Sequence, residues 1–154
     1  MNHWLMKSEP DVFGIDDLAR SPRKTTRWDG VRNYQARGFM RDDMRVGDLA
    51  FFYYSNTEEP GIAGIVKVVK RGYPDHTAFD KRDKHYDADS DPKNPRWYMV
   101  DVRLKERFTR IITLVELRKH AGKELKGMML LRPGNRLSVT PVEPEHWKFI
   151  RSLE

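Results

Sequence analysis

The sequence contains no cysteine, which excludes a disulfide framework and thiolate chemistry. It also has no long apolar run near its start, where only the segment Trp4 to Met6 precedes Lys7. A signal peptide or a membrane span needs a longer apolar segment than this. We therefore expect a cytoplasmic protein that has no membrane partner.

The motifs of the common catalytic sites are missing as well. There is no Gly-x-Ser-x-Gly elbow, no glycine-rich loop that cradles phosphate and no His-Glu-x-x-His pair. We predict no catalytic residue and no cofactor. The competing hypothesis is an enzyme that acts on nucleotides or nucleic acid with a His or Asp of segment 73–95, but that segment offers no nucleophile with a base beside it.

Segment 73–95 is a long polar loop, and such a loop inside a compact domain is often functional or mobile. Its residues 87–91 have the opening spacing of a calcium loop. The sixth position of that motif is Pro92, where glycine is required, and the twelfth is Tyr98, where a bidentate glutamate is required. His76 and His85 also lie in this loop, without a cysteine or a closely spaced glutamate. We predict no metal site.

What the chain does have is a basic composition around an ordinary apolar content. Its 154 residues, 38% hydrophobic and 34% charged, fit one globular domain over residues 1–154, which we expect to be a monomer. Lys and Arg number 29 against 23 Asp and Glu, for a net charge of +6. This balance favours a polyanionic partner. A protein-interaction adaptor whose basic face is incidental would have the same composition.

The hydrophobic periodicity predicts a mixed α+β domain around a small, strongly curved sheet. Residues 49–54 form a continuous apolar run, which fits a sheet covered on both faces or a barrel wall. Alternation over residues 97–104 predicts a strand with Trp97, Asp101 and Arg103 on one face. The other predicted strands are 3–7, 62–70 and 137–140, and the predicted helices are 14–20, 33–40, 109–120 and 144–150.

Segment 28–40 gives the strongest local indication of a binding site. We expect Asp29 to cap the helix that follows it. On that helix Asn33 shares a face with Ala36 and Met40, so if the face is buried, Asn33 is buried too and needs a hydrogen-bond partner. A pocket with polar contacts would explain this pattern. An ordinary helix start beside a core tryptophan would explain it equally well.

The loop before this segment is basic. Arg23, Lys24 and Arg27 can contact phosphate, although solvated surface is the ordinary role of any single such charge. We assign these three residues to a phosphate-binding rim. Trp97, which shares a strand face with charges, fits either the mouth of a pocket or the rim of a barrel, and we favour the pocket.

Six blocks of the sequence resemble the EVE domain family, in the right order and over essentially the whole chain. These blocks are residues 4–10, 28–37, 46–48, 54–55, 97–102 and 136–142. The resemblance implies a PUA-like curved β-barrel with short flanking helices. It also implies a nucleic-acid-binding domain that accommodates a modified base in a pocket.

The resemblance further implies which residues form that pocket. It would draw on Lys7, Ser8, Trp28, Arg32, Asn33, Ser55 and Trp97, with Arg136 and Ser138 in support. We expect the rim to hold phosphates of DNA or RNA, while an extruded base inserts between aromatic side chains and meets Ser8 and Asn33 with its polar edge. Stacking is worth roughly 1–3 kcal/mol per base and a buried methyl about 0.8 kcal/mol, so a modification should tune binding more than create it.

Overall fold

One six-stranded sheet carries the fold, and the computed structural model describes all of residues 1–154. The strands are β1 (His3–Ser8), β2 (Thr25–Arg27), β3 (Leu49–Tyr54), β4 (Gly61–Pro74), β5 (Tyr98–Thr113) and β6 (Val139–Val142). The α-helices are α1 (Ile15–Arg20), α2 (Tyr34–Gly38), α3 (Leu114–Arg118) and α4 (Pro144–Leu153). Shorter helical turns are η1 (Pro22–Lys24), η2 (Phe39–Asp43), η3 (His76–Phe79) and η4 (Met129–Leu131). The predicted mixed α+β class is confirmed.

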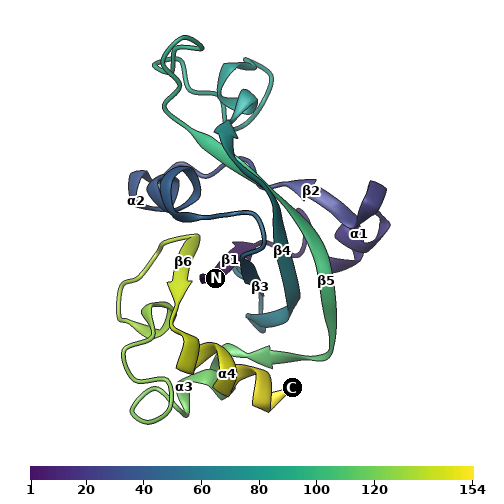
Figure 1. The fold of residues 1–154 in the computed structure, drawn as a ribbon, viewed down its shortest axis with the longest axis vertical. Helices are drawn as coiled ribbons and strands as arrows, with labels where there is room; N and C mark the ends of the chain where they lie inside the picture. Colours follow the sequence, from purple (N-terminus) through teal and green to yellow (C-terminus); the bar gives the residue numbers. More distant parts are fainter.

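Strands β4 and β5 are the longest strands, and they bend the sheet. They pair antiparallel with four register shifts between Ile62 and Tyr73, and each such bulge bends a strand and adds twist. Figure 1 shows the two strands running through the molecule, with segment 75–97 at one end and α3 and α4 at the other. The strand order is β2-β5-β4-β3-β1-β6. The edge strands β2 and β6 do not pair with each other, so the sheet is open and the predicted barrel is not confirmed.

Apolar side chains cover both faces of the sheet. In β3, Phe52 belongs to one buried cluster with Trp28, and Phe51 belongs to a second cluster with Trp147. Helices α1 and α2 contribute to the first cluster, and α3 and α4 contribute to the second. The run Leu49–Tyr54 is therefore covered on both faces, as its continuous apolar sequence predicted.

One predicted helix is wrong over its first part. The sequence predicted a helix over 109–120, but β5 continues to Thr113 and α3 starts only after it. Ile112 pairs with Ile62 of β4, and this buried β-branched pair holds the chain extended. Thr113 then caps α3, because its hydroxyl accepts a hydrogen bond from the Glu116 N–H at 3.1 Å.

The other element boundaries differ from the predictions by a few residues. Strand β6 begins at Val139 instead of residue 137, and α4 continues past residue 150 to Leu153. None of the helices is long and apolar enough to cross a membrane. No group of three or more His, Cys, Asp or Glu side chains is placed so that it could hold a metal ion.

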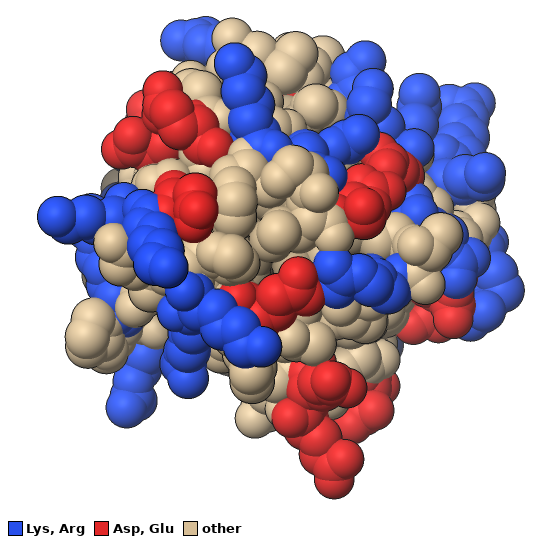
Figure 2. Space-filling view, turned by 90° about the horizontal axis from the view of Figure 1, so that it is seen from below, with Lys and Arg blue, Asp and Glu red and all other residues tan.

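The basic side chains are dispersed over the face drawn in Figure 2. That face lies below the view of Figure 1, and its Lys and Arg side chains surround uncharged surface and groups of Asp and Glu. The net charge of +6 is therefore not collected into one patch there. A binding surface has to be located from local geometry.

Candidate functional site

A cavity of about 1170 Å³ lies where the two edges of the sheet approach each other. Its wall includes Lys7 and Ser8 from the end of β1, residues 25–27 of β2, and Ser138 just before β6. Because β2 and β6 are opposite edges in the strand order, a strongly curved sheet is needed to bring β2 and the segment just before β6 to one cavity. Ligand pockets usually measure roughly 300–1,000 Å³, so this cavity has ample room for a ligand.

Main-chain hydrogen bonds fix the strand ends that form the cavity wall. The Lys7 N–H donates to the Ser138 carbonyl at 2.8 Å, and the Ser55 N–H donates to the Ser8 carbonyl at 3.0 Å. Strands β1 and β3 are parallel, so Ser8 and Ser55 leave the sheet at the same end. The Ser8 hydroxyl donates to the Phe13 carbonyl at 2.6 Å and so holds the turn that extends the wall.

Trp28 forms an aromatic part of the wall. It follows β2, and its N–H donates to the Val100 carbonyl at 2.7 Å. Its ring lies edge-on to Phe52, with 5.5 Å between centroids and 89° between planes. Only 7% of Trp28 is exposed, so a ligand can contact an edge of this ring but cannot cover its whole face. Phe13 and Tyr73 are the other aromatic residues of the wall.

Lys7 places an amine in the cavity wall. Burial lowers the pKa of Lys7, because a charged ammonium is less stable away from water. Its Nζ lies 6.0 Å from the centroid of the Tyr53 ring. Burial also raises the pKa of Tyr53 to about 12, so that phenol is neutral at physiological pH.

Exposed cationic side chains surround the cavity. They belong to Arg23, Arg27, Lys84 and Arg136. The third predicted rim residue, Lys24, does not line it. Arg23 and Lys24 both have left-handed backbone, with φ of 57° and 52°, where the chain turns from η1 into β2.

Two carboxylates of the cavity differ in their surroundings. Asp101 accepts a hydrogen bond from the Tyr73 hydroxyl at 2.6 Å. Burial, followed by that hydrogen bond, raises the pKa of Tyr73. Asp29 lies 3.7 Å from Arg27, measured from Oδ2 to Nε, and accepts no hydrogen bond within the chain. Burial, and next the charge of Asp75, raise the pKa of Asp29.

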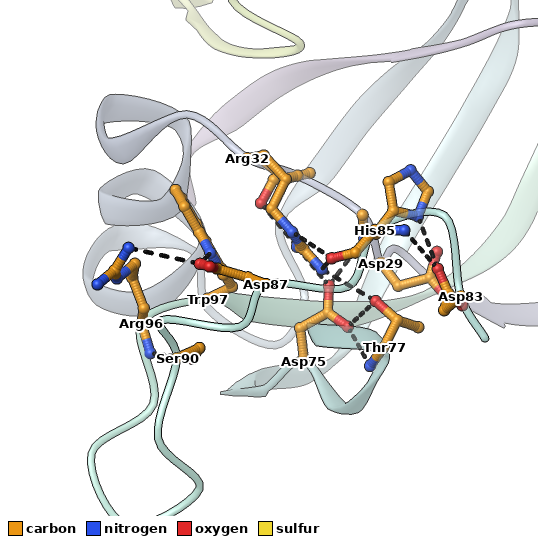
Figure 3. Close-up of polar contacts among 12 residues, drawn as sticks. Asp29, Arg32, Asp75, Thr77, Asp83, His85, Asp87, Ser90, Arg96 and Trp97 are labelled. Atoms are coloured by element: carbon orange, nitrogen blue, oxygen red, sulfur yellow. Dashed lines mark hydrogen bonds and ion pairs between the residues drawn. The ribbon is translucent and has the colours of Figure 1, made fainter. Parts of the chain in front are cut away.

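Arg32 does not line the cavity, because its guanidinium holds the wall together from behind. It donates to Asp75 Oδ2 at 3.0 Å, to Thr77 Oγ1 at 3.1 Å and to the His85 carbonyl at 2.8 and 3.1 Å. Figure 3 shows these contacts, and we call Arg32, Asp75, Thr77 and His85 the Arg32 cluster. Burial alone would raise the pKa of Asp75, but hydrogen bonds from Thr77, Gly30 and Arg32 lower it.

The Arg32 cluster holds segment 75–97 against the start of segment 28–40. The Gly30 N–H donates to Asp75 Oδ2 at 2.8 Å, and Gly30 has a left-handed φ of 77°. A Cβ at Gly30 would lie 2.5 Å from the His85 ring, so only glycine allows this approach. His85 and Lys84 thereby reach the cavity, although they lie far from Trp28 in sequence.

Trp97 is also outside the cavity. It is 6% exposed, its Nε1–H donates to Asp87 Oδ2 at 2.7 Å, and its ring stacks on Tyr34 with 5.0 Å between centroids. The Arg32 guanidinium lies 5.5 Å from its ring centroid. Trp97 thus anchors segment 75–97 to α2 and does not line the cavity with Trp28.

Asn33 caps α2. Its side-chain oxygen accepts hydrogen bonds from the N–H groups of Gln35 and Ala36 at 2.9 and 3.0 Å. The expectation that Asp29 caps this helix is wrong, and so is the burial of Asn33, which is exposed. Because the cap residue adopts extended backbone, its side chain leaves the face that Ala36 buries.

The structure therefore brings together most of the predicted residues. Those that line the cavity are Lys7, Ser8, Arg23, Arg27, Trp28, Ser55, Arg136 and Ser138. Those that lie outside it are Lys24, Arg32, Asn33 and Trp97. Sequence reasoning missed Tyr73, Lys84, His85 and Asp101, and gave Asp29 only a capping role. Strand alternation, which places Asp101 on the polar face of β5, was the one available signal.

Comparison with known proteins gives consistent matches over nearly the whole chain. The sequence model of the EVE domain matches residues 2–153. Thymocyte nuclear protein 1 of Danio rerio is 51% identical over 168 residues, which cover 99% of this chain and 72% of that protein. The Homo sapiens protein of the same name is 49% identical over 168 residues, covering 99% of this chain and 74% of its own length.

Solved structures agree with these sequence matches. Human THYN1 protein in complex with 5-methylcytosine-containing DNA is similar to this chain with a TM-score of 0.95 and 48% identity, covering 99% of this chain and 97% of that one. A protein from Pseudomonas syringae is similar with a TM-score of 0.92 and 46% identity, covering 98% of each chain.

Proposed function

This chain belongs to the EVE domain family, and from that premise we propose that it binds DNA and takes a modified base into the cavity between the edges of its sheet. The observation that carries this proposal is the cavity itself, where β2, the segment before β6, an aromatic edge and several cations meet. The DNA complex of human THYN1 protein, at 48% identity, supports the choice of DNA and of 5-methylcytosine as the first ligand to test.

The proposed mechanism separates phosphate binding from base binding. Arg23, Arg27 and Arg136 hold the backbone, and because phosphate contacts carry no sequence information, they contribute to every DNA equally. The base leaves its stack at a cost of a few kcal/mol and enters the cavity. There it meets the edge of Trp28 and the polar groups at the ends of β1 and β3.

Trp28 is the only tryptophan of the cavity wall, so the base does not bind between the pair of tryptophans that the sequence suggested. Trp97 is held by Asp87 and Tyr34, so the other contacts to the base come from lining residues such as Phe13, Tyr73 and Ser138. A buried methyl contributes about 0.8 kcal/mol, which is less than the roughly 1–3 kcal/mol of aromatic contact. We therefore expect 5-methylation to change affinity by only a few fold.

The test measures binding of fluorescently labelled DNA, single-stranded and duplex, with one central 5-methylcytosine or cytosine. Trp28→Ala should weaken binding of both by about 1–3 kcal/mol without changing its salt dependence. Trp147→Phe is the control, because Trp147 packs on Phe51 in the second cluster, away from the cavity.

A thermal melt must show that the Trp28→Ala protein is folded, and Trp28→Phe replaces it if it is not. Unchanged binding by the folded variant, or equal losses in the Trp147→Phe control, would mean that the cavity is not the base site. RNA of the same sequence is a separate arm of the experiment, and tighter binding of RNA would overturn the choice of DNA.

A further inference from the structure

The cavity contains three acidic residues, and one of them has no hydrogen-bond donor. Glu9 accepts from Asn56 Nδ2 at 2.5 Å, and Asp101 accepts from the Tyr73 hydroxyl at 2.6 Å. The Asp29 carboxylate forms one ion pair, with Arg27 at 3.7 Å, which is too long for a hydrogen bond. The Asp29 carboxylate is thus the free acceptor in this wall.

The hydrogen-bond donors closest to Asp29 in sequence donate to another residue. The Gly30 N–H, which follows Asp29 directly, donates to Asp75, and so does the Arg32 guanidinium. The Asp29 side chain is only 35% exposed, so most of its surface is shielded from water. Burial and the neighbouring Asp75 both oppose its charge. Because the Asp29 carboxylate accepts no hydrogen bond from the chain and still reaches the cavity, it is available to a donor on a ligand.

We propose that Asp29 determines which base the cavity accepts, by accepting a hydrogen bond from the exocyclic amine of cytosine. This inference rests on the proposed function, because it needs a base in the cavity. Carboxylates accept from cytosine N4 in known recognition, whereas thymine presents a carbonyl oxygen at that position and meets the carboxylate as a second acceptor. The class of ligand is therefore an amino-bearing pyrimidine.

Position in the wall supports this assignment. Asp29 and Trp28 both line the cavity, so a base bound there against Trp28 has the Asp29 carboxylate in the same wall. Figure 3 shows Asp29 beside Arg32 and His85, two members of the Arg32 cluster that fixes this part of the wall. A fixed acceptor beside the aromatic contact can bind the amine on C4, whereas the 5-methyl group is carried by the neighbouring ring carbon and makes no hydrogen bond.

The sharpest test compares 5-methylcytosine with thymine, because the two bases share the 5-methyl group and differ at the amine. Three labelled DNAs are needed, identical except for 5-methylcytosine, cytosine or thymine at one position. The parent protein should bind the 5-methylcytosine DNA about 5- to 150-fold more tightly than the thymine DNA. Asp29→Ala and Asp29→Asn should reduce that ratio to within about 3-fold, because the alanine has no acceptor and the amide can also donate to the thymine carbonyl.

The control is Asp80→Asn, which makes the same change at a carboxylate outside the cavity and should keep the parent ratio. The ratio of 5-methylcytosine to cytosine should stay the same in all variants. Asp29→Asn has nearly the shape of the parent side chain, so it carries the test if Asp29→Ala is unfolded in a thermal melt.

Failure of this inference differs from failure of the proposed function. If the parent binds 5-methylcytosine DNA in a Trp28-dependent way but folded Asp29 variants keep the parent ratio, Asp29 does not read the base. If the parent binds no DNA, or binds it independently of Trp28, the proposal that the cavity binds a base is wrong, and so is the proposed role of Asp29.

Discussion

The cavity wall and the Arg32 cluster lie side by side, and they differ in how their polar groups are satisfied. In the Arg32 cluster, Asp75 accepts from Arg32, Thr77 and Gly30, and it is fully buried. In the cavity, Asp29 lacks a donor. Satisfied buried groups hold a fold together, whereas unsatisfied groups in a cavity are available to a ligand. This contrast separates the supporting residues of the site from the binding residues.

The largest effect should come from breaking the Arg32 cluster. Asp75→Asn removes the charge that Arg32 faces in a buried setting, so it should lower the free energy of unfolding by about 3–5 kcal/mol. Denaturant unfolding followed by circular dichroism measures this loss. Asp80→Asn is the control, because Asp80 is partly exposed and contacts only its neighbour Arg82. A loss below 1 kcal/mol for Asp75→Asn would show that the cluster is not a structural support.

The same residue predicts how stability depends on pH. Because the folded-state pKa of Asp75 is lowered, its stabilisation is complete above the unfolded pKa of about 3.9. The stabilisation is lost as the pH falls through the folded-state pKa. The unfolding free energy of the parent should therefore decrease more steeply below about pH 4 than that of Asp75→Asn. Parallel curves for the two proteins would contradict this assignment.

Substitutions of Trp97 and Trp28 should affect different quantities, the stability of the fold and the affinity for DNA. Trp97→Phe removes the donor to Asp87, which should cost about 1–3 kcal/mol of stability and leave DNA affinity unchanged. Trp28→Phe should have the opposite profile, with weaker DNA binding and a smaller loss of stability. Melting curves and binding titrations on both variants test this. A loss of DNA affinity in Trp97→Phe, at conditions where it is folded, would place Trp97 in the base site after all.

Asn33→Ala should have a smaller effect. Loss of an N-cap costs about 1 kcal/mol, and because Asn33 is outside the cavity, the affinity for every DNA should be that of the parent. Asn33→Ser, which keeps a capping side chain, should recover most of the stability. If Asn33→Ala selectively weakens binding of 5-methylcytosine DNA, the cavity extends further toward α2 than its lining indicates.

The smallest effect should be that of single rim cations. Arg136→Ala should reduce the slope of log affinity against log salt by about 0.9 on duplex DNA, equally for all sequences. Lys24→Ala is the matched control, since Lys24 is exposed but does not line the cavity. Titrations at several salt concentrations give both slopes. Equal changes for the two variants would mean that the whole basic surface, and not the cavity rim, contacts phosphate.

Much of the fold could be predicted from sequence periodicity alone. The apolar run Leu49–Tyr54 lies in the middle of the sheet with both faces covered, as expected. The extension of β5 to Thr113 could not be predicted, because residues 109–113 carry no clear period and are held extended by pairing with β4. That pairing depends on residues far away in the sequence.

The sequence allowed us to predict the site residues that lie at the ends of strands. It did not allow us to predict the role of a residue whose hydrogen-bond partner is distant in sequence. Lys7 and Ser8 end a strand, and their place in the cavity agrees with the family resemblance. Arg32 has the same local features as a ligand-binding arginine, but its partner Asp75 lies 43 residues away. Only the folded chain shows that this partner already occupies the guanidinium.

The width of the cavity depends on the bulged pairing of β4 and β5, and therefore also on residues that do not line the cavity. At Gly64 a Cβ would overlap the Glu106 carbonyl of the neighbouring strand, so a side chain there must push the two strands apart. Because the same strands lie between edges β2 and β6, a change of their bend moves the edges relative to each other. Related domains could therefore evolve, or be engineered, to take larger or smaller bases by substitutions in the middle of the sheet, with every residue of the cavity wall unchanged.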